Sequence, residues 1–462
     1  MKVLLAGYNI DSELIKEINM HIATPETISA AYARISRSQK DVTSLRVESL
    51  SEVEKARQSN SNIIYEMGHS SIAEHAVFNF DLIGISRLMS ELIQRSRLAS
   101  FTEKSQRYVT LKGDYIVPEE IKKLPDLEKK FHSLIEKQNH LYEFLFEEAK
   151  LYLQQQHIFD NKRDLEGKAK EDARYVLSLA TQTQMGITIN GRSLERLLRR
   201  LDSSDLIEAK TLKQTIEEQV KPIAPSLIKY TDADHYGKNI SLNDIEPQKQ
   251  QIHARMIEMT DNAERKILIA HFMDQMNYSY NQAESIVKKM SSDDIKDAFQ
   301  CIYDGIKSYH TLPRSFEMCD ITLELSMSSS CFGQLKRHRM ASIFRSAYHP
   351  AYDYSVPPLL QKLNVEDRIS ILMKESETLY HQFEKVKQGL GAYCLTNAHH
   401  VNVLMKCNLR ELYHFIRLRS DQHAQWEIKQ LSDEILALVK PLLPNAGLYL
   451  AGKDSFHLIH HN

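Results

Sequence analysis

Apolar residues recur three and four positions apart over long stretches of this chain, which is the spacing of an amphipathic helix. Stretches of this kind cover residues 122–156, 192–218, 254–307, 366–390 and 408–440. Alternation of apolar and polar residues, the period of a half-buried strand, is rarer and occurs at residues 76–82 and 321–327. The pattern predicts an α+β protein that is rich in helices, with a further short strand at the start of the chain.

Three blocks of sequence occur twice and in the same order. They are the residues around Arg95 and Arg337, those from Asn190 and Asn408, and residues 220–225 and 439–444. Repetition at a nearly constant separation indicates an internal duplication. We therefore predict two tandem units, at residues 1–235 and 250–462, with the link between them in the polar stretch 230–250.

The composition is that of an ordinary globular protein. The chain has 462 residues, 42% of them hydrophobic, and its formal net charge is −2, so no overall positive field attracts nucleic acid. No apolar run is long enough for a membrane span or a signal peptide, and we expect a cytoplasmic protein without a membrane partner. The five cysteines all lie in the second half without C-x-x-C spacing, so we expect reduced thiols and no metal site.

The blocks around the two arginine motifs carry the candidate chemistry. In Arg337-His338-Arg339, two guanidinium groups flank an imidazole. In an extended segment alternate side chains point the same way, so both arginines can bind one anion from one side. Downstream of the first copy's motif, Ser105 and Arg107 form a candidate phosphate cradle. The alternative, a solvated basic patch, is weakened because the motif recurs at the same place in both copies.

These residues carry a resemblance to a known family. Residues 68–80, 95–108 and 190–194, and above all the run 408–428 with its H-A-Q-W-E-I segment, resemble the flavin-dependent thymidylate synthase family. The resemblance covers most of both halves and implies two helix-rich units, each with a central antiparallel sheet. It also implies an enzyme that methylates dUMP to dTMP, with methylenetetrahydrofolate and NADPH as co-substrates and FAD as cofactor. No cysteine of the enzyme attacks the pyrimidine in that family.

The resemblance also assigns site residues to this sequence. For dUMP it implies Gln334, Arg337, Glu103, Lys104, Ser105, Gln106, Arg107, Arg174 and Arg419. For FAD it implies His69, Ser71, Glu103, Arg337, His338, Arg339, Asn408, Arg410 and His414. Arg419 is the candidate catalytic residue. Because arginine cannot accept a proton at working pH, we expect it to stabilise negative charge on the pyrimidine.

The two copies have lost different parts of this set. Where the first copy has Glu103, Ser105, Arg107 and Arg174, the second has Arg345, Ala347, His349 and Ala392. In the first copy Ser96 replaces the imidazole, and Leu201 stands where Arg419 ends its helix, with Arg200 one residue away. Active sites in the family are shared between the subunits of a homotetramer. We therefore expect one complete site built from both halves, one degenerate site per chain, and a homodimer that reproduces the tetramer.

Three alternatives stay open at this point. The chain is either an enzyme of this kind, or a degenerate protein that binds flavin or nucleotide without turnover, or a flavin- and folate-dependent enzyme that acts on another uridine nucleotide. The third alternative includes a uridine within RNA, which the balanced charge disfavours. The intact Ser105 and Arg107, with Arg174, favour a free monophosphate.

Overall fold

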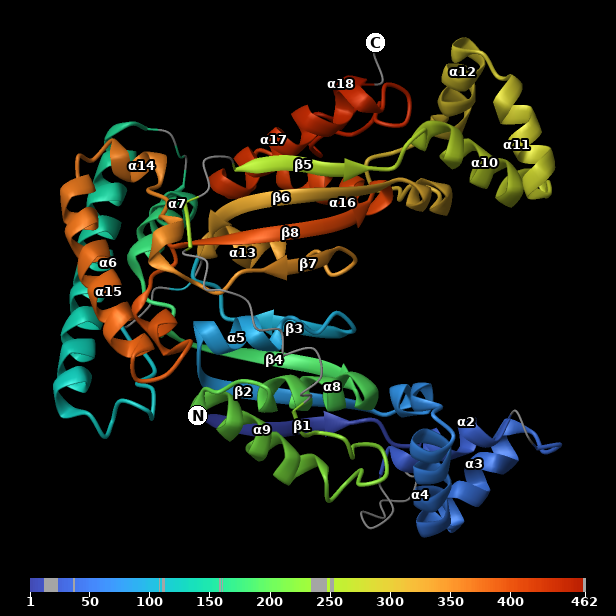
Figure 1. The fold of residues 1–462 in the computed structure, drawn as a ribbon, viewed down its shortest axis with the longest axis horizontal. Coiled ribbons are helices and arrows are strands. Elements are labelled where there is room, and N and C mark those ends of the chain that lie inside the picture. The colour runs from blue at the N-terminus through green and yellow to red at the C-terminus, as the bar shows by residue number, and fades with distance from the viewer. Residues whose placement is uncertain are drawn as a thin grey trace. The chain divides into compact units, whose positions relative to one another are not determined.

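The structure is a computed structural model that describes residues 1–11, 24–35, 38–107, 109, 113–157, 159, 161–233, 247–249 and 253–459. The chain forms two compact units (Figure 1). The first consists of Met1–Ile245 with Arg368–Leu395, and the second of Glu246–Asp367 with Thr396–Asn462. A segment of the second sequence copy thus belongs to the first compact unit. The division at 1–235 and 250–462 stays a prediction of where the copies begin and end, and most of the expected link lies outside the described residues.

Each unit has a four-stranded antiparallel sheet. The strands of the first are β1 (Lys2–Tyr8), β2 (Val77–Ser86), β4 (Gln182–Asn190) and β3 (Ala99–Glu103), in that spatial order. Those of the second are β5 (Ala254–Met259), β6 (Asp320–Ser328), β8 (His400–Asn408) and β7 (Ser342–Arg345). The spatial order is therefore the same in both. The predicted α+β class, with two helix-rich units and a sheet in each, is confirmed.

Helices make up most of the remaining structure. In the first unit they are α2 (Glu26–Arg34), α3 (Val42–Ser51), α4 (Val53–Ser61), α5 (Arg87–Ile93), α6 (Pro125–Gln155), α7 (Lys162–Ala173), α8 (Gly191–Asp202), α9 (Ile207–Val220) and most of α15 (Glu366–Glu384). In the second they are α10 (Ala263–Met276), α11 (Tyr280–Lys289), α12 (Ser292–Tyr303), α13 (Ser329–Leu335), α14 (Pro358–Gln361), α16 (Leu409–Arg419), α17 (Trp426–Val439) and α18 (Phe456–Ile459). No helix in the described ranges is long and apolar enough to cross a membrane.

The helical periodicity was a good guide except at one place. Residues 122–156 and 366–390 hold α6 and α15, and the stretch 192–218 holds α8 and α9. The prediction that 254–307 begins as a helix is wrong, because Ala254–Met259 form strand β5. Five of these six residues pair with β6, with Ala254 opposite Leu325 and a bulge between Met256 and Glu258. Pairing with a distant strand outweighs the local helical spacing there.

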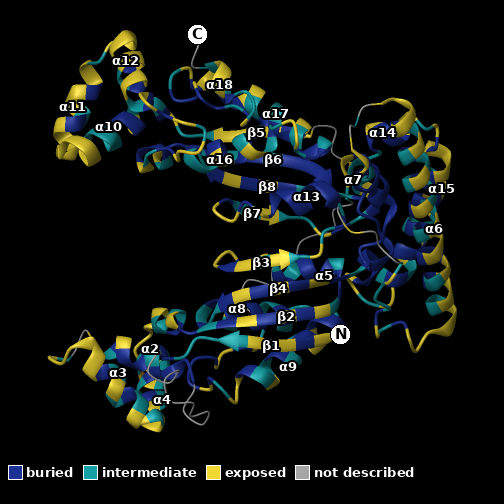
Figure 2. Ribbon diagram, turned by 180° about the vertical axis from the view of Figure 1, so that it is seen from behind, coloured by how far each residue is buried: buried dark blue, intermediate teal, exposed yellow. Residues whose placement is uncertain are grey.

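Alternating side chains bury one face of each sheet. On β2, Phe78, Phe80 and Leu82 are buried, whereas Asn79 and Asp81 between them are exposed. Burial of such large apolar side chains contributes about 1.5–3 kcal/mol each. The buried faces of the central strands are visible as dark blue segments in Figure 2. The sheets therefore form a rigid base for the segments that follow each strand.

Helices α6 and α15 run side by side in the first unit (Figures 1 and 2). The buried side-chain amide of Gln138 on α6 donates to Ser376 Oγ at 3.0 Å and to the Cys394 carbonyl oxygen at 3.1 Å. The rings of Phe131 and Phe383 lie 5.5 Å apart. Helices from both sequence copies thus form one packed pair, which fixes residues 368–395 within the first unit.

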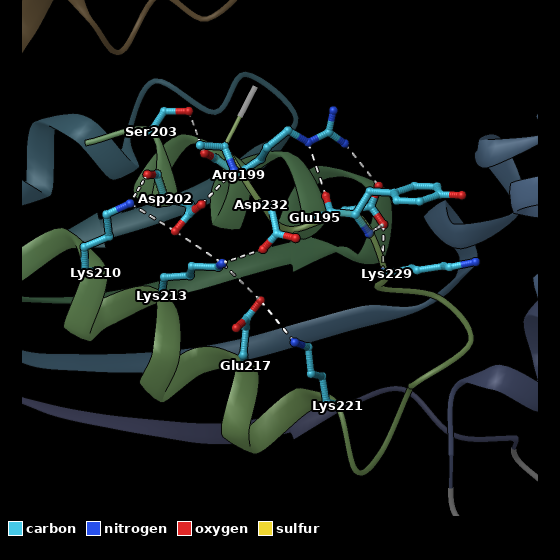
Figure 3. Close-up of polar contacts among 12 residues, drawn as sticks. Glu195, Arg199, Asp202, Ser203, Lys210, Lys213, Glu217, Lys221, Lys229 and Asp232 are labelled. Atoms are coloured by element: carbon cyan, nitrogen blue, oxygen red, sulfur yellow. Dashed lines mark hydrogen bonds and ion pairs between the residues drawn. The ribbon is translucent and has the colours of Figure 1, made fainter. Parts of the chain in front are cut away.

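Ion pairs join the helices α8 and α9 to the chain that follows them (Figure 3). Lys213 Nζ lies 3.3 Å from an oxygen of Asp202, 3.8 Å from Glu217 and 3.3 Å from Asp232. The backbone N–H of Lys229 donates to Glu195 at 3.0 Å. Exposed ion pairs are individually weak, but together these contacts hold residues 229–232 against α8 and α9.

Burial of His399 gives stability a specific dependence on pH. This fully buried imidazole accepts a hydrogen bond at Nδ1 from the Thr396 N–H at 3.0 Å. Burial, together with the neighbouring His400, lowers its pKa from 6.5 to about 3. The unfolded chain takes up a proton near pH 6.5 and the folded chain does not.

We expect the free energy of unfolding of the wild type to fall, because of this group, by about 1.4 kcal/mol per pH unit between pH 6 and pH 4. His399→Gln removes the titrating group. Unfolding of this variant should therefore take up one proton fewer, and its free energy of unfolding should change less with pH. Urea denaturation at several pH values measures this slope. The same change at exposed His140 is the control, and equal slopes for all three proteins would contradict the prediction.

Candidate active site

A buried glutamate positions the helix that precedes each arginine motif. In the first unit Glu208 accepts from the Ser86 N–H and from Ser86 Oγ, both at 2.7 Å. In the second unit Glu427 accepts from the Ser328 N–H at 2.8 Å and from the Ser328 hydroxyl. Each serine is the N-cap of a short helix, α5 or α13. Glu427 itself lies on α17, so its carboxylate joins that helix to the start of α13.

At the end of β3 the side chain of Glu103 is held by three groups of the first unit. Its carboxylate lies 2.7 Å from Arg87 Nη1 and accepts from Ser90 Oγ at 2.9 Å and from Gln94 Nε2 at 2.7 Å. These partners come from α5 and its C-cap. Glu103 thus joins the end of the strand to the helix, and its contact with dUMP or FAD stays a prediction.

The next residues make a turn that presents candidate phosphate ligands. The Lys104 N–H bonds to the Gln184 carbonyl, and Ser105 Oγ accepts from the Arg107 N–H at 3.2 Å. Gln106 between them is buried. Arg107 Nε lies 2.6 Å from a carboxylate oxygen of Glu171 on α7. The turn therefore holds a partly buried guanidinium group against an acid.

Arg174 also contacts Glu171, which lies three residues before it in the chain. It is only 6% exposed, and its Nε donates to the Glu171 carbonyl oxygen at 3.2 Å. Burial lowers the pKa of its guanidinium, and the positive charges of Arg107 and Arg87 lower it further. Arg107 and Arg174 thus both contact Glu171, and that they bind the phosphate of dUMP together stays a prediction. Excess buried positive charge of this kind suits a phosphate group.

A second carboxylate in this cluster was missed by the sequence analysis. Asp172 is fully buried and lies 3.1 Å from Lys168 Nζ. Burial raises its pKa from 3.8 to about 6. Lys168 lies four residues before Asp172 on α7, so the sequence indicated that these two can pair, but not that Asp172 is buried.

In the second unit the Arg-His-Arg motif lies in a turn after α13. The side chains of Arg337 and Arg339 are exposed, and His338 between them is 3% exposed. The Arg339 N–H bonds to the Arg337 carbonyl at 3.0 Å, which keeps the turn tight. The motif therefore places two guanidinium groups at the surface and an imidazole below them.

The buried imidazole orients the candidate catalytic arginine. Arg419 Nε donates to His338 Nε2 at 3.1 Å, and its terminal nitrogens donate to the side-chain and backbone oxygens of Gln334 at 3.2 and 3.3 Å. His338 Nδ1 lies 3.3 Å from Glu411. Burial lowers the pKa of His338, and the charge of Arg419 lowers it further. A neutral ring that donates from Nδ1 to Glu411 leaves Nε2 as the acceptor for Arg419.

The remaining predicted flavin residues of this unit line a cavity. A cavity of about 160 Å³ is bordered by Asn408, Arg410 and His414, with Glu411 and Met340. Asn408 caps α16 by accepting from the Glu411 N–H at 2.9 Å.

Arg410 is fixed at the start of α16. Its Nε donates to the Leu312 carbonyl at 2.8 Å, and Nη1 pairs with Glu317 at 3.0 Å. His414 lies one helical turn on, with its ring 5.6 Å from that of His338. The structure therefore brings together the sequence-predicted residues on α16.

His69 and Ser71 lie in the first unit and are exposed at a 3₁₀ turn, Ser70–His75. The His69 N–H bonds to the Ile63 carbonyl. That these two residues share a flavin pocket with those of the second unit stays a prediction, as does the joining of Arg107 and Arg419 in one site. No group of three His, Cys, Asp or Glu side chains suited to a metal ion occurs within the described ranges.

Comparison with known proteins identifies the family. The family model for thymidylate synthase complementing protein matches residues 17–226 and again residues 255–445. The chain belongs to this family. The double match also agrees with the duplication of sequence blocks, so this member of the family contains two copies of the unit.

Two relatives match the chain over different lengths. The UPF0159 protein Ta1429 of Thermoplasma acidophilum is 23% identical over 430 residues, which are 83% of this chain and 86% of that protein. The flavin-dependent thymidylate synthase of Clostridium tetani is 33% identical over 211 residues, which are 45% of this chain and 82% of the relative.

Two solved structures are also similar. Flavin-dependent thymidylate synthase ThyX from Helicobacter pylori, complexed with FAD and dUMP, is 21% identical, covers 50% of this chain and all of its own, and has a TM-score of 0.32. The UMP/dUMP methylase PolB from Streptomyces cacaoi, bound with 5-Br dUMP, is 17% identical, covers 49% of this chain and 92% of its own, and has a TM-score of 0.35.

The raised pKa of Asp172 predicts a second pH effect. The folded protein holds the Asp172 proton up to about pH 6, whereas the unfolded chain loses it near 3.8. Wild-type stability therefore falls as pH rises between these values, and Asp172→Asn does not share this loss. We expect the variant to gain up to about 3 kcal/mol relative to the wild type above pH 6, and only about 0.5 kcal/mol at pH 4.

Thermal denaturation of both proteins at pH 4, 6 and 8 measures this gain. Exposed Asp205→Asn is the matched control. A gain for Asp172→Asn that does not vary with pH would refute the proposed cause.

Proposed function

We propose that this chain is a flavin-dependent thymidylate synthase. Its reaction would be the reductive methylation of dUMP to dTMP, with methylenetetrahydrofolate and NADPH as co-substrates and FAD as cofactor. Family membership and the names of relatives support this class of reaction. The observation that carries the proposal is the orientation of Arg419 by a buried, neutral His338 and by Gln334.

The phosphate of dUMP is assigned to the cluster on the first unit. Arg107 and Arg174 meet at Glu171, and Ser105 lies beside the Arg107 backbone. Charge-assisted hydrogen bonds from guanidinium groups to phosphate are short and strong. A phosphate that enters would share Arg107 with the carboxylate of Glu171, so the cluster is already arranged around one negative charge.

Arg419 is assigned to the pyrimidine. An arginine side chain stays protonated at working pH and cannot abstract a proton, so Arg419 stabilises negative charge that develops on the pyrimidine N3 and O2 as C5 attacks. Fixed donors are effective because they need no reorganisation during the reaction. His338 and Gln334 supply this fixation, and Glu411 sets the tautomer of His338.

FAD fits the residues on α16 and in the Arg337 turn. Arg410 borders the cavity, and its donors are oriented by the Leu312 carbonyl and by Glu317. Arg337 and Arg339 are exposed and closely precede Met340, which also borders the cavity. These cations suit the phosphates of a dinucleotide. Bound FAD supplies the relay of a hydride from NADPH to the one-carbon unit. The residues themselves hold the dinucleotide and balance its negative charge.

The complete site would combine the two units. The first contributes Arg107 and Arg174, and the second contributes Arg419 and His338. Because each copy lacks what the other retains, we propose that each chain has one complete site and one degenerate site. The two copies that form the complete site would belong to one chain or to the two chains of a homodimer.

Turnover tests the proposal directly. We expect purified protein to be yellow, and to release tritium from C5-labelled dUMP only when both methylenetetrahydrofolate and NADPH are present. Arg107→Ala and Arg419→Ala should each reduce the rate of release by a factor of about 100 or more, because each removes a charged contact to the substrate.

Arg163→Ala serves as the control, since this exposed arginine lies on α7 and outside the proposed site. Flavin binding without any tritium release from the wild type would favour the alternative of a binding protein. Unchanged release in Arg107→Ala would overturn the assignment of the phosphate.

A further inference from the structure

Helix α8 of the first unit has a row of arginines on one face. Arg192, Arg196 and Arg200 are spaced four residues apart on this helix. Residues four apart lie above one another on a helix, and eight residues span about 12 Å along its axis. We call these three residues the α8 arginine row. The row places three positive charges along a path as long as a small phosphorylated ligand.

Two members of the row have no acidic partner. Arg192 pairs with Glu74, at 2.5 Å from Nη1 to the carboxylate. Neither Arg196, which is exposed, nor Arg200 forms an ion pair with a carboxylate in the parts of the chain that the structure describes. Arg200 Nη1 donates to Ser96 Oγ at 3.0 Å, and burial lowers the pKa of its guanidinium. A partly buried cation that meets only a hydroxyl group favours the approach of an anion.

The second unit shows what this arrangement resembles. Ser96 occupies the position of His338 in the repeated motif, between two exposed arginines in both copies. The sequence places Leu201 where Arg419 ends its helix, with Arg200 one residue away, and so left open whether this arginine is lost. In the structure Leu201 is buried in the core, and Arg200 makes the contact to the central residue of the motif from one position earlier.

We propose that the α8 arginine row, with Ser96, binds a phosphate-bearing small molecule that has at least two negative charges. The first unit then has a ligand site of its own, in addition to the phosphate cluster at Arg107. Guanidinium groups bind phosphate oxygens in pairs, which suits two or more linked phosphates. A net charge of −2 on the whole chain disfavours nucleic acid as the ligand. The inference does not require that the chain turns over dUMP.

Hydrogen-exchange mass spectrometry of the full chain with inorganic pyrophosphate tests the site. We expect pyrophosphate to slow amide exchange in α8 of the wild type. Arg200→Gln should raise the pyrophosphate concentration needed for half of this protection about ten-fold or more, because a charged hydrogen-bond donor is lost. Arg196→Gln should act in the same direction.

Arg199→Gln is the matched control. It removes the same charge from the same helix, but Arg199 is paired with Glu195 at 3.2 Å, so protection should remain within about two-fold of the wild type. Unchanged exchange in β4 without ligand shows that each variant is folded. Absence of protection in the wild type, or equal losses in Arg199→Gln and Arg200→Gln, would overturn the proposal.

FAD as a competitor identifies the source of the phosphates. If FAD displaces pyrophosphate from α8, the ligand is a dinucleotide of the cofactor type, and if it does not, the ligand is another phosphorylated metabolite. Both results depend on protection of α8 and support the site. A wild type that shows this protection but releases no tritium from dUMP would refute the proposed function and leave this site in place.

Discussion

The buried carboxylates of Glu208 and Glu427 are the contacts on which both functional turns depend. Each accepts two hydrogen bonds from the serine that caps a short helix, Ser86 or Ser328. Those helices lead within a turn or two to the arginine motifs. A buried acid left without its partners costs about 1–3 kcal/mol or more, so the geometry is strongly constrained. The same glutamate–serine contact in both units explains why their motifs present a buried residue between two exposed arginines.

Much of the fold followed from the sequence because its signals are local. The periodicity of residues 122–156 predicted α6, and the repeated blocks predicted two similar units before any strand order was known. Residues 254–259 were misassigned because their conformation depends on pairing with β6, more than sixty residues away. The association of residues 368–395 with the first unit could not be predicted from the sequence either, since nothing in that segment specifies Gln138 as a partner.

The candidate site was predictable to the extent that it is a motif. The sequence identified Arg419 as a substrate residue and His338 as a flavin residue, but not the hydrogen bond of 3.1 Å between them. Glu411 was not identified, although its place three residues after Asn408 on a helix was a usable signal. The buried state of Asp172, which sets its pKa, depends on how α7 packs and has no local signature.

The incorporation of α15 into the first unit has an evolutionary consequence. A duplicated gene normally yields halves that can again be separated, since each retains its own folding information. Here residues 368–395, encoded in the second half, are part of the first compact unit. A break between residues 235 and 250 would leave the N-terminal fragment without α15. The C-terminal fragment would keep α15 but lack the helix α6 against which it packs. The fusion is therefore entrenched, and the two copies were free to diverge because neither was again required to fold alone.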